Sequence, residues 1–143
     1  MPLPTAAPDK SKEADSVIHY LKMIRRDAIQ AQSLNNIDIL TLHHQLVRAG
    51  IKFSALHASG LTKEVLGPVI ETKLGINWVD YSDEYTQLVE VDMPMFVSTV
   101  RAHQTEICQQ EIATDRLIFT PISQATKDTL LPLINKIANA IEG

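Results

Sequence analysis

The chain has 143 residues, of which 45% are hydrophobic and 21% charged, so it is long enough to bury a core and is not typical of a disordered protein. The formal net charge at pH 7 is −4, and one cysteine excludes an internal disulfide. No apolar run reaches the roughly 18 residues of a membrane span, so we expect a cytoplasmic protein that does not enter a membrane.

The first elements are predicted from composition and from the spacing of apolar residues. Residues 1–12 are rich in proline and small side chains, which predicts a flexible tail in front of a single helical domain over residues 13–143. From Glu13 onward, apolar residues recur at spacings of three and four, which is typical of a helix with one buried face. These residues are Ala14, Val17, Leu21, Ile24, Ala28 and Ala31.

The second helix is predicted over residues 37–49, after a cap in the stretch Ser33 to Asn36. Gly50 favours the left-handed conformation in which many helices end, and Ile51 is placed to fold back onto the last turn. We therefore expect the helix to end at Gly50, followed by a short turn that begins at Ser54.

A third helix is expected after the break at Ser59-Gly60. Thr62 is a suitable cap, Leu74 is the expected last residue and Gly75 closes the helix. Pro68 lies inside this span, so either the helix bends there or it starts afresh with the proline in its first turn.

Residues 76–91 are predicted to be helical, with Ser82 as a capping residue, although residues 87–91 alternate in the manner of a short strand. This stretch also opens the acidic half of the chain. Residues 1–75 carry a charge of +2 and residues 76–143 a charge of −6. The acidic half disfavours extended contact with nucleic acid, because like charges repel.

Two further helices complete the predicted fold. Asp92 and Pro94 favour a helix start, and we expect that helix to continue to about Leu117. The last helix is expected to begin at Thr120-Pro121 and to run through Pro132, which points away from its apolar face. The sequence thus predicts an all-α protein, a compact bundle of five to six helices with a flexible N-terminal tail.

Five polar residues fall on or beside the apolar faces of these helices, namely Arg25, His43, His103, Gln104 and Glu111. Burying an unpaired charge is costly, so such groups are expected to meet each other, a ligand or water. In one interpretation they form a polar layer that binds a small molecule or a metal, with Arg25 paired to Glu111. His43 then faces His103 or Gln104. In the other, His43 is a hydrogen-bonded core residue and the rest line a dimer seam or reach solvent.

No motif in the chain specifies a reaction. Paired Glu-x-x-His motifs bind di-iron centres in bundles, but this chain offers only the reversed order from His103 to Glu106. The glycine-rich loops that bind phosphate are also missing. We therefore assign no catalytic residue, no metal ligand and no cofactor.

The sequence favours a non-enzymatic module that binds another protein, with a second copy of the chain as the first candidate and hence a homodimer. An acidic segment with two tyrosines is the expected partner surface, formed by Asp80, Tyr81, Asp83, Glu84 and Tyr85. A small-molecule or metal-binding bundle is the alternative. A helix-turn-helix over residues 42–61, with Gly50 in the turn, is less favoured because few basic residues lie where bases are read.

Overall fold

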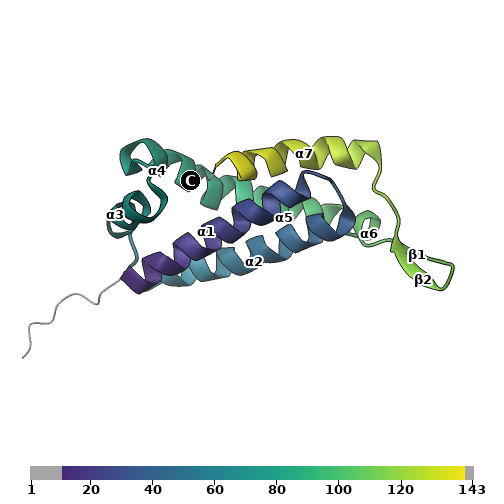
Figure 1. Ribbon diagram of the computed structural model, residues 1–143, viewed down its shortest axis with the longest axis horizontal. Coiled ribbons are helices and arrows are strands. Elements are labelled where there is room, and N and C mark those ends of the chain that lie inside the picture. The colour runs from purple at the N-terminus through teal and green to yellow at the C-terminus, as the bar shows by residue number, and fades with distance from the viewer. Residues whose placement is uncertain (1–10, 141–143) are drawn as a thin grey trace, which may run out of the picture.

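A bundle of four helices forms the main part of the protein in the computed structural model, which describes residues 11–140. Its sides are α1 (Ser11–Ala31), α2 (Asn36–Ala58), α5 (Met93–Ala102) and α7 (Gln124–Asn139). α1 packs against α2 and α7, and α5 packs against the same two helices from the opposite corner (Figure 1). The prediction of an all-α bundle is confirmed. Residues 1–10 of the predicted tail lie outside the described residues.

Shorter elements close the two ends of this bundle. At one end, α3 (Lys63–Leu74) packs against α1, and α4 (Trp78–Gln87) packs against α3. At the other end lie α6 (Gln104–Ile107) and a hairpin of two strands, β1 (Gln110–Ala113) and β2 (Arg116–Phe119). The hairpin projects beyond the helices (Figure 1). None of the described helices is both long enough and apolar enough to cross a membrane.

The apolar face of α1 forms the centre of the core. All six residues whose spacing predicted this helix are fully buried, and the prediction is confirmed: Ala14, Val17, Leu21, Ile24, Ala28 and Ala31. α7 adds Leu130, Ile134 and Ile137 to the same core. Fully burying a side chain of this size contributes about 1.5–3 kcal/mol, so these faces fix how the helices pack.

The second helix does not end at Gly50, and that prediction is wrong. α2 continues to Ala58 because its apolar spacing continues through Phe53 and Leu56, both of which are buried. A glycine inside a helix costs about 1 kcal/mol relative to alanine, and the burial of these two side chains outweighs that cost. The predicted break at Ser59-Gly60 is confirmed, since Gly60 adopts a φ of +104°.

Helix α4 runs into α5 without a break, because the turn from Leu88 to Asp92 is a π-helix, η1, rather than a loop. In this turn the N–H of Met93 donates to the carbonyl of Leu88, five residues back. α5 does begin at Met93, with Asp92 before it and Pro94 in its first turn as predicted, but it follows the π turn rather than a loop. In a regular helix a proline lacks the N–H for the backbone hydrogen bond, and its ring crowds the carbonyl four residues earlier. The wider π turn lies directly before Pro94, where it relieves this crowding. α4 itself confirms the helix predicted for this stretch, with Asn77 rather than Ser82 as its cap.

Helix α3 has the predicted boundaries. Thr62 caps its first turn by accepting a hydrogen bond from the N–H of Val65, and Gly75 ends it with a φ of +68°. Pro68 lies within the continuous helix on its exposed side. Gly67 faces the ring of Trp78, so α3 and α4 approach closely at this point.

Residues 103–117 do not continue the preceding helix, and that prediction is wrong. α5 ends at Ala102, α6 adds one turn, and the chain then forms the hairpin. The apolar spacing of α5 stops after Val100, because Gln104 and Glu111 occupy the positions where the helix would require apolar residues. β-branched and aromatic residues such as Ile112, Ile118 and Phe119 favour strands instead.

Helix α7 is largely as predicted. It begins at Gln124 with Ser123 as its cap, a few residues after the expected start at Thr120-Pro121. Pro132 is exposed within one continuous helix, which confirms that the proline lies away from the apolar face.

Substitution of two buried or half-buried helical glycines is expected to change stability in opposite directions. A Cβ at Gly50 meets no atom within 4 Å, so Gly50→Ala should raise the free energy of unfolding by about 0.5–1 kcal/mol. A Cβ at Gly67 would lie 2.5 Å from the ring of Trp78, so Gly67→Ala should lower it by about 1–3 kcal/mol. Urea unfolding followed by circular dichroism measures both changes. Destabilisation by Gly50→Ala would show that α2 does not run through this position.

Candidate functional site

The predicted polar layer is not formed. Arg25 is exposed on α1, and Glu111 is exposed on β1 because the predicted helix does not reach it. The ion pair recorded within residues 11–140 joins Arg26 to Asp27, with 3.1 Å between Nε and Oδ1, so Arg25 and Glu111 do not pair. Gln104 is likewise exposed, on α6.

The two histidines of the predicted layer have separate surroundings. His103 ends α5, and its Nδ1 lies 2.9 Å from the carbonyl oxygen of Thr99. His43 is half-buried on α2, and its Nε2 is buried with no hydrogen-bond partner among the described residues. Burial lowers the pKa of His43, and the charge of Arg101 lowers it further. Arg101 was not among the residues predicted to form the layer, and it is the charged group that acts most strongly on His43.

Metal binding finds no support in the arrangement of these side chains. In the described part of the chain, no three His, Cys, Asp or Glu side chains are placed to hold one ion. The histidines at positions 43 and 103 therefore lack the further ligands that zinc or iron needs.

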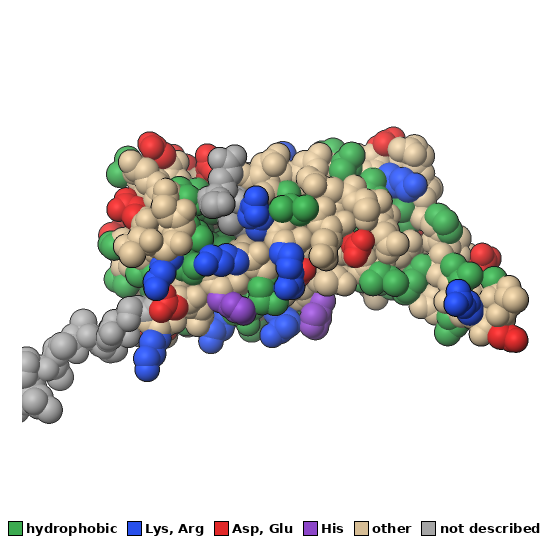
Figure 2. All heavy atoms as spheres, viewed as in Figure 1, with side chains coloured by type: hydrophobic (Ala, Val, Ile, Leu, Met, Phe, Trp, Pro, Cys, Tyr) green, Lys and Arg blue, Asp and Glu red, His purple; other side chains and the backbone are tan. Residues whose placement is uncertain are grey.

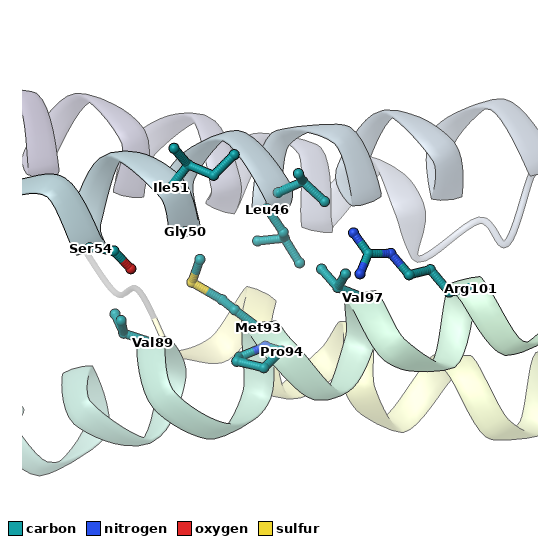
Figure 3. A pocket seen from close by; sticks show the side chains of 10 residues that line it. Leu46, Gly50, Ile51, Ser54, Val89, Met93, Pro94, Val97 and Arg101 are labelled. Atoms are coloured by element: carbon teal, nitrogen blue, oxygen red, sulfur yellow. The ribbon is translucent and has the colours of Figure 1, made fainter.

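An apolar groove runs between the antiparallel helices α2 and α5 (Figure 3). α2 contributes Leu46, Val47, Gly50 and Ile51. The η1 turn and α5 contribute Val89, Met93, Pro94 and Val97. Ser54 lies at one end and Arg101 at the other, and the groove holds about 500 Å³, within the usual range for small-molecule sites.

The hairpin presents one almost wholly apolar face to solvent. Ile112 pairs with Leu117 and Gln110 pairs with Phe119 in the antiparallel ladder, so these four side chains share a face. Ile112 is 77% exposed and Leu117 is 71% exposed. The opposite face carries Glu111 and Arg116 together with Ile118 and Ala113. The hydrophobic side chains on the hairpin are visible beyond the helices in Figure 2.

A single buried amide fixes the base of this hairpin. The side chain of Asn36, at the start of α2, donates to the carbonyl of Ile107 at 2.7 Å and to that of Thr120 at 3.0 Å. These carbonyls lie on either side of the hairpin in sequence. A further hydrogen bond, from the N–H of Thr120 to the carbonyl of Gln109 at 2.8 Å, extends the hairpin ladder toward Asn36. The side chain of Asn36 is 6% exposed, and its two hydrogen bonds tie both ends of the hairpin segment to α2.

Glu106 joins the same region to α7. Its carboxylate accepts from the N–H of Ser123 at 2.6 Å and from the hydroxyl of Thr126 at 2.5 Å, at the positive end of the helix. The hydrogen bond from Thr126, followed by those from Ser123, lowers the pKa of Glu106. α6 is therefore attached to the first turn of α7 as well as to the hairpin.

The hairpin turn is unusual in its residues. Thr114 and Asp115 form the two-residue loop with φ values of +52° and +64°. Positive φ at both central residues is typical of a type I′ turn, which normally carries asparagine and glycine. A β-branched threonine in this conformation is rare and strained. The sequence lacks the usual turn signal at Thr114-Asp115, which is why a helix rather than a hairpin was predicted here.

The acidic segment does not present its tyrosines to solvent, contrary to the prediction. Tyr81 and Tyr85 are buried beside Trp78, and their hydroxyl groups have no hydrogen-bond partner among the described residues. Burial raises the pKa of both phenols. Asp80, Asp83 and Glu84 are exposed, and the last two border a hollow between α4 and α7 that also contains the buried Asp92.

A helix-turn-helix is excluded for residues 42–61. Residues 36–58 form one continuous helix, and Gly50 lies within it, so the turn between two DNA-binding helices is missing at that place.

Comparisons with known proteins give no assignment: no model of a protein family, no curated protein and no solved structure matches this chain.

Loss of the Asn36 amide is expected to loosen the hairpin selectively. Asn36→Ala removes two hydrogen bonds and leaves two carbonyls without that donor, which should lower the free energy of unfolding by about 2 kcal/mol. The amides of residues 110–119 should then exchange with deuterium faster than in the unsubstituted protein. Asn35→Ala is the matched control, because it removes the cap of α2 but no bond to the hairpin segment. Equal exchange of residues 110–119 in the two variants would contradict the role given to Asn36.

Proposed function

We propose that this protein is a non-enzymatic interaction module that forms a homodimer through the apolar face of its hairpin. The observation that supports the proposal is the exposed cross-strand pair of Ile112 and Leu117. A hairpin of two strands is marginally stable by itself in water, and large apolar side chains on it gain most from a partner that covers them.

A second copy fits this face because the face is uncharged and a partly apolar hollow lies beside it. Leu117, Ile118 and Phe119 line this hollow of about 430 Å³ together with Ile37 and Pro121, and its lining also includes Asn35 and Lys127. In a twofold arrangement, Ile112 near the tip of one hairpin enters this hollow on the other copy, and the reverse contact forms at the same time.

The proposed dimer is weak and depends on concentration. The face consists of four side chains, whereas each side of a stable complex usually contributes roughly 20–30 residues. We therefore expect a dissociation constant on the order of 10 µM.

We also propose a cytoplasmic location, which is supported by the exposed and unpaired Cys108, since thiols are kept reduced there.

Replacement of the exposed apolar pair should abolish self-association. Ile112→Ser combined with Leu117→Ser removes most of the buried apolar surface of the proposed interface and leaves the helical core intact, so the protein should be monomeric. Sedimentation velocity at concentrations from 1 to about 200 µM spans the expected dissociation constant.

Val79→Ser is the matched control for that experiment. Val79 is 81% exposed on α4, at the opposite end of the bundle from the hairpin, so this variant should dimerise as the unsubstituted protein does. A monomeric unsubstituted protein across the whole range would refute the homodimer. Dimers that persist in the double variant would place the interface elsewhere.

A further inference from the structure

The groove between α2 and α5 combines an apolar floor with a positive charge at one end only. Leu46 and Met93 are buried and form its floor, pointing from the two helices toward each other (Figure 3). Ile51 and Pro94 are exposed and form its rims, and Ile51 is 68% exposed. The lining side chains from Val89 to Arg101 extend over roughly 18 Å along the helix axis.

Arg101 has no carboxylate partner within residues 11–140. Its side chain reaches from α5 toward α2 at the end of the groove (Figure 3). Guanidinium groups bind carboxylates in two parallel hydrogen bonds.

We propose that this groove binds a long-chain carboxylate, with the alkyl chain along Leu46, Gly50 and Met93 and the carboxylate at Arg101. An unbranched chain with one terminal negative charge matches a groove whose single charged residue lies at one end. An amphipathic helix from a protein would instead expose polar side chains along its whole length, and beside this groove the rims are apolar. The site is independent of the hairpin and of the proposed dimer.

Binding of dodecanoate, measured by isothermal titration calorimetry below its critical micelle concentration, tests the proposal. We expect binding with one site per chain. Butyrate, which carries the headgroup alone, should not bind. Dodecyltrimethylammonium, which has the same chain with a positive headgroup, should bind at least tenfold more weakly because Arg101 repels it.

Two substitutions test the contacts of the carboxylate and of the alkyl chain separately. Arg101→Gln should weaken dodecanoate binding by about tenfold, because a charged hydrogen-bond donor is lost. Gly50→Leu should abolish binding, because its side chain enters the groove, where a Cβ meets no atom within 4 Å, without removing any existing contact. Arg48→Gln is the control, since Arg48 is exposed on α2 but does not line the groove. Circular dichroism verifies that each variant is folded.

A variant of the hairpin tests whether dodecanoate binds to the apolar face of the hairpin instead of the groove. The double variant Ile112→Ser with Leu117→Ser should bind dodecanoate as the unsubstituted protein does. The proposal is overturned if no dodecanoate binds, if Arg101→Gln and Gly50→Leu bind it unchanged, or if the trimethylammonium compound binds equally well. It is also overturned if an acidic amphipathic peptide binds the groove and dodecanoate does not, because the occupant is then a protein helix.

Discussion

The side-chain amide of Asn36 is the interaction on which the end of the molecule that carries the hairpin depends. It joins the first turn of α2 to two carbonyls that lie before and after the hairpin, so one buried residue closes a loop of the chain. Glu106 then attaches α6 to the first turn of α7. These two residues hold the hairpin beside Ile37, and the hollow at the base of the hairpin depends on that placement.

The groove between α2 and α5 depends on two features that are unusual in a regular helix. Gly50 lies inside α2, where any larger residue would fill the space between the helices, and the π turn from Leu88 to Asp92 allows α4 and α5 to continue past Pro94. Both features cost stability in an isolated helix. The core offsets that cost, because α2 and α5 each bury several large side chains toward α1 and α7. The groove and the hairpin face therefore arise from different causes and are independent surfaces.

The sequence predicted those elements whose local signals agree with their packing. α1 follows from six evenly spaced apolar residues, and α3 follows from Thr62 and Gly75, both of which act as caps. It failed where tertiary contacts override a local preference, as at Gly50, where burial of Phe53 carries the helix onward. Gln104 and Glu111 share an apolar face only in a helix that continues past Ala102, whereas Gln104 begins α6 and Glu111 lies in β1. The groove that ends at Arg101 could not be predicted, because Leu46 and Met93, which form its floor, lie far apart in the sequence and are brought together only by the antiparallel packing of α2 and α5.

The contact between two copies of the hairpin is tested most directly by nuclear magnetic resonance on a mixture of differently labelled chains. One half of the sample carries ¹³C-labelled isoleucine and leucine methyl groups, and the other half is deuterated and ¹⁵N-labelled. At concentrations well above the expected dissociation constant, we predict intermolecular Overhauser effects from the methyl groups of Ile112 and Leu117 to amides of residues 37 and 117–119 in the other copy. Intermolecular effects confined to any other surface, or none at all, would contradict the account.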